Sequence, residues 1–179
     1  VKNSKNKTVT TTVKTTVQTT VTTKSTVATV SVSSIAPKAD ARVRNAYNTL
    51  GFKVAINSGV SYSGYFSARD RSITLRAKDN TIYHELGHFL GFIAGNVDVS
   101  KNFVTIYNKE KSKYTGSNKA YVIQNSSEYF AESFKDYCLS PAALKKARPQ
   151  TYAFIQASLN KVTTKQVSMI KSAYSSVWK

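Results

Sequence analysis

Two histidines and a glutamate stand together in the run His84-Glu85-Leu86-Gly87-His88, which has the pattern H-E-x-x-H. In a helix, residues four apart leave the same face, so the two imidazoles would offer neighbouring nitrogen donors to one Zn²⁺. Glu85 leaves from an adjacent face, where its carboxylate can reach a metal-bound water without ligating the metal. The alternative is a core helix whose histidines are satisfied by hydrogen bonds. We favour a metal site because the chain contains no other histidine.

The residues around this motif predict a helix over about residues 80–94. Asp79 or Asn80 can cap its start, because a short polar side chain accepts hydrogen bonds from the free N–H groups of the first turn. Gly95-Asn96 supplies a stop signal. Apolar residues recur at helical spacing between these ends, at Ile82, Leu86, Phe89, Leu90 and Phe92.

A row of acids lies further along the chain, on a second predicted helix that begins at Asn125 and ends near Pro141. Glu128, Glu132 and Asp136 are spaced four apart, so they share one face and repel one another. The chain has only nine acidic residues against 26 basic ones. In such a chain, the row indicates a functional site rather than an ordinary solvated face.

The two motifs together predict where a third zinc ligand comes from. A hydrolytic zinc site takes three protein ligands and keeps one position open for water. The pattern H-E-x-x-H-x-x-G-x-x-H would add a third histidine, and Gly91 matches it, but Ala94 stands where that histidine is required. The third ligand must then be a carboxylate, Glu128 or Glu132. If Glu128 ligates, Glu132 can accept the other N–H of a zinc-bound histidine.

The elements that must position these residues follow from the hydrophobic pattern. Ahead of the metal-site helix we predict a helix over 39–50, strands over 52–56 and 72–76, and a strand or loop over 61–68. Between the two motif helices we predict a short helix or strand at 103–107 and a basic loop over 109–119. The remaining chain predicts core helices over 142–147, 150–159 and 164–177.

The first 36 residues have a different composition from the rest. Valines repeat every fourth residue between Thr, Lys and Gln, and the segment contains no aromatic residue or leucine. It cannot bury enough surface to offset the entropy lost on ordering. We therefore expect a disordered linker over 1–36 and one folded domain over 37–179. The competing interpretation is a β segment, because Thr and Val both favour strands.

The formal net charge of +17 suits a chain that contacts polyanions, although a solvated basic surface explains it equally well. No stacking motif with interleaved basic residues is present, which argues against nucleic acid. No run of 18 apolar residues exists, so we expect no transmembrane helix. The single cysteine, Cys138, excludes an internal disulfide and is expected to be a buried, unreactive thiol.

Three motifs resemble one known family. They are H-E-x-x-H, then Tyr121 with Glu128 seven residues later in Glu128-Tyr129-Phe130-Ala131-Glu132-Ser133-Phe134, and finally residues 147–155. Their order and spacing over residues 39–160 are similar to the catalytic domain of anthrax lethal factor and to the related small secreted Pro-Pro endopeptidases. The resemblance does not assign the family's proline-selecting subsite to particular residues here, so it leaves open whether the substrate contains proline.

The resemblance implies a role for each candidate residue. His84, His88 and Glu128 would be zinc ligands, and Glu85 would be the base that activates water. Glu132 would orient a ligand histidine. Tyr121 would donate its hydroxyl to the oxyanion, which is chemically reasonable because a tetrahedral intermediate needs a donor where negative charge develops.

We therefore expect an α+β fold: a mostly helical, zincin-like metallopeptidase domain with a short β-sheet, an active-site helix and C-terminal helices. The predicted function is zinc-dependent endopeptidase activity on an unidentified peptide or protein, by a secreted, extracellular bacterial protein that acts as a monomer. The alternative is a non-catalytic basic module that binds anionic cell-wall polymer or nucleic acid. A third hypothesis is a catalytic fold that serves as a toxin component.

Overall fold

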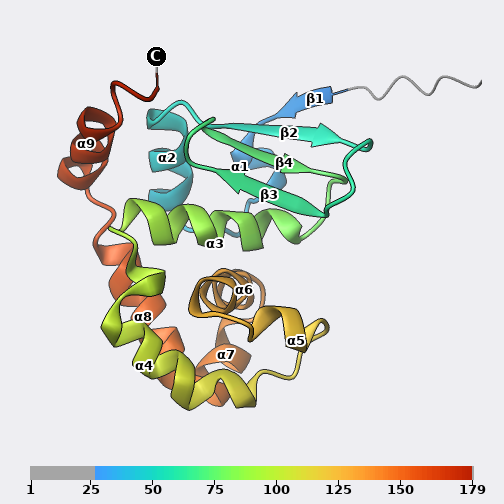
Figure 1. Cartoon of the computed structure of the whole chain (residues 1–179), viewed down its shortest axis with the longest axis vertical. Coiled ribbons are helices and arrows are strands. Elements are labelled where there is room, and N and C mark those ends of the chain that lie inside the picture. The colour runs from blue at the N-terminus through green and yellow to red at the C-terminus, as the bar shows by residue number, and fades with distance from the viewer. Residues whose placement is uncertain (1–26, 179) are drawn as a thin grey trace, which may run out of the picture.

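A four-stranded mixed sheet packs against a largely helical body (Figure 1). The computed structural model describes residues 27–178. The strand order is β1-β2-β4-β3, in which β2 and β4 are parallel and the two outer strands run antiparallel to their neighbours. The strands are β1 (Val27–Val30), β2 (Lys53–Asn57), β3 (Gly64–Ser67) and β4 (Ser72–Leu75). The predicted α+β fold is confirmed, and β3 forms one edge of the sheet.

The helices follow the predicted order. Helices α1 (Val32–Ile35) and α2 (Ala41–Thr49) lie between β1 and β2 in the chain. Helix α3 (Thr81–Ile93) follows β4 and carries the H-E-x-x-H motif. The segment predicted as a short helix or strand is helical, within α4 (Lys101–Glu110). The later helices are α5 (Lys119–Val122), α6 (Ser126–Leu139), α7 (Pro141–Ala147), α8 (Pro149–Asn160) and α9 (Thr164–Ala173).

Ordered structure begins earlier in the chain than its composition predicts. Residues 27–35 fall within the predicted disordered linker, but they contain β1 and α1. Val30 pairs with Val54 of β2, and the side chain of Val32 enters the core. The physical reason is tertiary: β2 supplies the hydrogen-bonding partner that a Thr/Val segment lacks in isolation, so the competing β interpretation is correct for Val27–Val30. The expectation for residues 1–26 lies outside the described residues.

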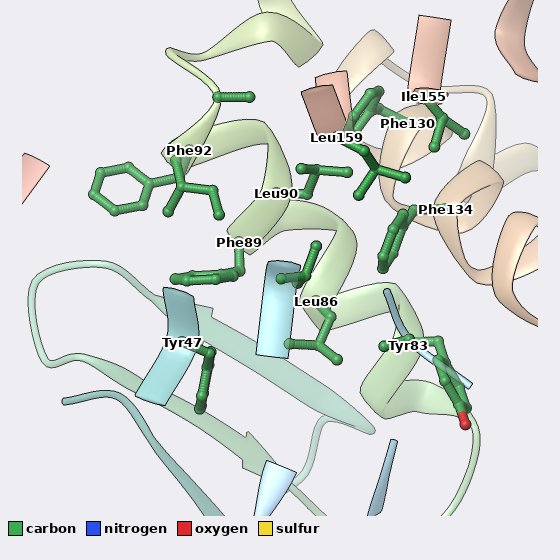
Figure 2. Packing of buried hydrophobic residues seen from close by; sticks show 14 of the residues in the cluster. Tyr47, Tyr83, Leu86, Phe89, Leu90, Phe92, Phe130, Phe134, Ile155 and Leu159 are labelled. Atoms are coloured by element: carbon green, nitrogen blue, oxygen red, sulfur yellow. The ribbon is translucent and has the colours of Figure 1, made fainter. Parts of the chain in front are cut away.

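Helix α3 is buried on two sides because the core continues across it (Figure 2). On its sheet side, the ring of Phe89 lies 5.0 Å from the rings of both Tyr47 and Phe52, centroid to centroid. On its other side, Leu90 is fully buried toward Phe130 of α6 and Leu159 of α8. Burying each such side chain contributes roughly 1.5–3 kcal/mol. The motif is therefore held in the middle of the molecule.

Helices α3 and α6 approach each other at Gly87. A Cβ atom at Gly87 would lie 2.6 Å from the Cα of Ala131, closer than real Cβ atoms come. A glycine is required here because it lets the two backbones touch. The contact lies between the two histidines in sequence, so it turns His84 and His88 toward the acidic face of α6. Among the described helices, none combines the length and apolar character needed to cross a bilayer.

Candidate metal centre

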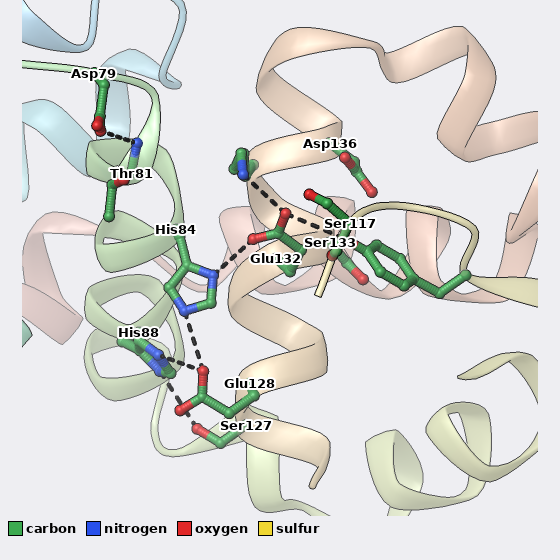
Figure 3. A network of polar contacts seen from close by, with 12 residues as sticks. Asp79, Thr81, His84, His88, Ser117, Ser127, Glu128, Glu132, Ser133 and Asp136 are labelled. Carbon is green, nitrogen blue, oxygen red and sulfur yellow. Dashed lines mark hydrogen bonds and ion pairs between the residues drawn. The ribbon is translucent and has the colours of Figure 1, made fainter. Parts of the chain in front are cut away.

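The imidazoles of His84 and His88 converge on one carboxylate of α6 (Figure 3). Glu128 Oε2 lies 3.1 Å from His84 Nε2 and 3.6 Å from His88 Nε2. The two rings are 5.0 Å apart and nearly perpendicular, at 76°. The candidate ligand atoms of the three residues all lie within 4.8 Å of one another. The structure thus brings together residues from two segments about forty positions apart in the chain.

This donor set fits a zinc ion. Zn²⁺ binds nitrogen and oxygen ligands at about 2.0–2.1 Å in tetrahedral geometry, which places ligand atoms about 3.3 Å from each other. The observed separations of 3.1 and 3.6 Å fall on either side of that value. His84 is buried, whereas His88 and Glu128 are half-buried, so one side of the cluster stays accessible. The three residues could hold Zn²⁺ with little rearrangement.

Local sequence explains why the two helices begin where they do. Asn125 caps α6 as predicted, because its side chain accepts a 2.9 Å hydrogen bond from the backbone N–H of Glu128. Glu128 consequently stands in the first turn, where the helix dipole favours a negative charge. At α3, the capping side chain is Asp79, whose Oδ1 accepts from the N–H of Thr81 at 2.9 Å. Asn80 makes no such bond.

Glu132 contacts the nitrogen of His84 that does not face Glu128. Its Oε2 lies 2.8 Å from His84 Nδ1, which leaves Nε2 directed at Glu128. The other oxygen, Oε1, accepts a 2.8 Å bond from Lys135 and lies 3.3 Å from the hydroxyl of Tyr114. Sequence reasoning missed both partners. Lys135 could have been found from its i+3 spacing to Glu132, whereas Tyr114 reaches the site from a turn that carries no motif.

The charges of this cluster shift the pKa values of its members. Burial disfavours the imidazolium of His84, but the hydrogen bonds that it donates to Glu128 and Glu132 outweigh burial and raise the pKa of His84 to about 9. Burial would raise the pKa of both glutamates, yet their contacts with histidine lower it, for Glu132 to about 2 with the help of Lys135. Glu128 and Glu132 are therefore both anionic at neutral pH and form a site for a cation.

Glu85 has a different environment. Its side chain is 5% exposed and packs against Gly64 of β3, where a Cβ atom would collide with Glu85 Oε1. Burial is the largest influence on this carboxylate and raises its pKa, although the charges of His84 and His88 and the backbone N–H of Phe66 oppose the shift. Glu85 therefore does not join the three converging side chains, and it binds protons more readily than an ordinary glutamate.

A cavity of about 370 Å³ opens beside the cluster. Tyr121 lines it from α5, with 54% of the residue exposed. Partial burial and the negative charge of the nearby Glu128 raise the pKa of Tyr121 to about 12, so the hydroxyl keeps its proton at neutral pH. Glu85 and His84 also face this space. The walls are completed by Tyr62, Ser63, Gly64, Thr81, Ser117, Asn118, Val122, Glu132 and Lys135.

Asp136, the third acid of the row, does not belong to this centre. Arg148 forms an ion pair with it, and the same guanidinium donates a 2.8 Å bond to the hydroxyl of Ser133. The expectation that all three acids form one site is therefore wrong for Asp136. The reason is that α8 follows α6 closely enough for the buried Arg148 to meet the last acid of the row. Cys138 is half-buried, less than predicted, and burial raises the pKa of its thiol to about 12.

Comparison with known proteins identifies the family. Residues 53–158 match the family model described as anthrax toxin lethal factor, N- and C-terminal domain. The chain belongs to this family. The match runs from β2 to α8, so it contains every residue of the candidate centre. No curated protein matched the sequence. Membership in the lethal factor family, together with the His84–His88–Glu128 cluster, indicates a zinc metallopeptidase.

Proposed function

We propose that this lethal factor family protein is a zinc-dependent endopeptidase. The observation that carries the proposal is the convergence of His84, His88 and Glu128 on one point, beside a cavity that Glu85 faces without joining the cluster. A structural zinc site would use a fourth protein ligand and would be closed. Three ligands and an adjacent cavity suit a hydrolytic site instead.

The residues around the cavity divide the chemistry among them. Bound Zn²⁺ would lower the pKa of a water molecule and polarise the substrate carbonyl. Glu85 accepts the proton of the attacking water and returns it to the leaving amine, a role favoured by its raised pKa. Tyr121 donates a hydrogen bond from its hydroxyl to the substrate carbonyl oxygen, on which negative charge develops. With zinc bound, Glu132 would accept the hydrogen bond of His84 Nδ1–H and so leave the Nε2 lone pair for the metal.

The edge of the sheet offers a place for the peptide. Strand β3 is an outer strand, and Ser63 and Gly64 at its start line the cavity next to Glu85. An extended peptide can add to such an edge through main-chain hydrogen bonds. Binding of this kind does not require a free chain end, which is consistent with cleavage inside a polypeptide.

The setting and the partners are proposals as well. We place the protein outside the cell, as a secreted monomer, whose net charge of +17 attracts acidic substrates or anionic cell-wall polymer. The same charge favours the second candidate function, a non-catalytic module that binds anionic polymer. Metal dependence separates the two, because only a zinc peptidase should lose its function in a chelator.

The decisive experiment is cleavage of a peptide library by zinc-loaded protein, with and without chelator, and with Glu85→Gln as the comparison. We expect Glu85→Gln to keep stoichiometric zinc and to lose activity by about 10²–10⁴-fold, the contribution of a general base. Zinc content measured on the same sample shows that the loss is not a loss of metal. A metal-replete Glu85→Gln with full activity would refute the assignment of the base, and an inert, zinc-free wild type would refute the peptidase.

A further inference from the structure

His88 has a support of its own, built differently from that of His84. Its Nδ1 lies 3.5 Å from the hydroxyl oxygen of Ser127, at the start of α6. That hydroxyl donates a 2.5 Å hydrogen bond to Oδ2 of Asp98. Asp98 stands in the 3-10 turn Val97–Val99 that follows α3, and it is 8% exposed. Figure 3 shows Ser127 beside His88, on the side away from His84.

The donors and acceptors along this chain favour one arrangement when a metal occupies the centre. A carboxylate only accepts, so the single proton of the Ser127 hydroxyl goes to Asp98. The lone pairs of Ser127 then face His88, and Nδ1 must carry a proton to satisfy them. Nε2 is then the nitrogen that would bind a metal, on the side where Glu128 Oε2 lies 3.6 Å away. Asp98 thus selects the tautomer of His88 that can ligate a metal.

Gly91 makes room for this carboxylate. A Cβ atom at Gly91 would lie 2.9 Å from both Cγ and Oδ1 of Asp98. Glycine costs about 1 kcal/mol relative to alanine in the interior of a helix. Gly91 lies one helical turn after His88, on a buried face of α3. The close approach of Asp98 explains why a glycine stands there.

We propose that Asp98 and Ser127 are positioning residues for the zinc ligand His88, the relayed counterpart of the direct contact between Glu132 and His84. The inference rests on the proposed zinc site. Carboxylates that orient ligand histidines are worth about 10–100-fold in metal affinity. The competing explanation is purely structural, because the bond from Ser127 to Asp98 also fastens the turn after α3 to the first turn of α6.

Zinc affinity separates these explanations. The dissociation constant is measured by competition with a chelator for the wild type, Ser127→Ala, Ser127→Thr and Asp98→Asn. Ser133→Ala is the matched control, since it removes a buried hydroxyl of the same helix that bonds Arg148 instead of the centre. The thermal midpoint of each metal-free protein reports the structural role alone. The visible spectrum of the Co²⁺-loaded proteins reports the coordination geometry.

We expect Ser127→Ala and Asp98→Asn to weaken zinc binding about 10–100-fold and to change the Co²⁺ spectrum, with Ser127→Thr close to the wild type. Ser133→Ala should stay within about twofold. A Ser127→Ala protein that melts lower but binds zinc as tightly as the wild type would overturn the proposal, whatever Asp98→Asn does. If zinc binding responds as expected but no peptide is cleaved, the proposed function fails and the positioning role stands.

Discussion

Glu85 on α3 and Glu132 on α6 both lie near the imidazole of His84. Nevertheless, the pKa of Glu85 is raised, whereas the pKa of Glu132 is lowered to about 2. Burial pushes both values upward. On α3 the carboxylate is enclosed against β3, and the nearby charges do not compensate. On α6 the hydrogen bonds of His84 and Lys135 do compensate. Pairs of carboxylates separated in this way mark which one transfers protons and which one remains an anion.

The largest effect should come from the anion that contacts both imidazoles. Glu128→Gln replaces a charged oxygen ligand by a neutral amide, so we expect zinc affinity to fall by more than the roughly 100-fold that an orienting residue contributes. Glu132→Gln is the matched comparison, because it alters the same helix one turn later and should stay within that range. Equal losses for the two variants would contradict the division between ligand and support.

Tyr121→Phe tests the residue that we propose as the oxyanion donor, which lines the cavity and is not a zinc ligand. Loss of one oxyanion donor typically costs about 10²–10³ in kcat. The ring remains and the hydroxyl is not needed to hold the metal, so zinc content should be unchanged. Steady-state kinetics on a cleaved library peptide measure the effect. A change in KM with kcat intact would instead assign Tyr121 to substrate binding.

Gly64→Ala tests whether Glu85 depends on its place against β3. The new Cβ would collide with Glu85 Oε1 and approach Thr81 Cγ2 to 2.6 Å. Both are ends of side chains that can shift, so the fold should survive while the base moves. We expect activity to fall about 10–100-fold, below the 10²–10⁴ of a full base deletion, with zinc retained. Addition of Gly64→Ala to Glu85→Gln should cost little more, which double-mutant kinetics would reveal.

The pKa of His84 predicts how zinc binding depends on pH. In the metal-free protein this value is about 9, so the imidazole holds a proton at neutral pH and zinc must displace it. Affinity should then rise about tenfold per pH unit between roughly pH 6.5 and 8.5. An unperturbed histidine, with a pKa of about 6.5, would give a nearly flat profile above pH 7. Metal-buffered titrations distinguish the two slopes.

The same shifts fix the stability of the metal-free protein. The raised pKa of His84 stabilises the fold at pH values below 6.5, the pKa of this residue in the unfolded chain. This contribution is lost as the pH rises through about 9. A lowered pKa, as for Glu132, contributes above 4.5, and this is lost as pH falls through about 2. The thermal midpoint of the metal-free protein should therefore be highest between about pH 4.5 and 6.5, where both contributions are fully present. Glu132→Gln should flatten both sides of the profile, because it removes one shifted group and one cause of the other shift.

The sequence predicted the two motif helices well because their signals are local. The histidine spacing and the Asn125 cap each act within one turn, and the structure contains both features. Asp98 and Tyr114 carried no signal, because each acts through a partner that only the tertiary fold brings near. Family resemblance, not spacing, chose Glu128 over Glu132 as the ligand. Strand β1 was missed since its pairing partner is more than twenty residues away.

The acidic row of α6 shows most clearly where local reasoning ends. Helical spacing places Asp136 on the same face as Glu128 and Glu132, but spacing alone does not show that α8 will bring Arg148 against it. The outcome depends on which element covers each turn of α6. Two acids face α3 and its histidines, while the third faces the start of α8.

Asp136→Asn should consequently have the smallest effect on the centre. We expect zinc affinity within about twofold of the wild type, because no atom of Asp136 contacts a histidine. Stability should fall nonetheless, since Arg148 is buried and would lose its anionic partner. Breaking a fully buried pair costs about 3–5 kcal/mol, but the side chain of Asp136 is 34% exposed and Ser133 still accepts from the guanidinium, so roughly 1–2 kcal/mol is expected. Denaturant unfolding and zinc competition on one sample measure both. A variant that keeps its stability but loses zinc would return Asp136 to the site, and would show that all three acids of α6 act together.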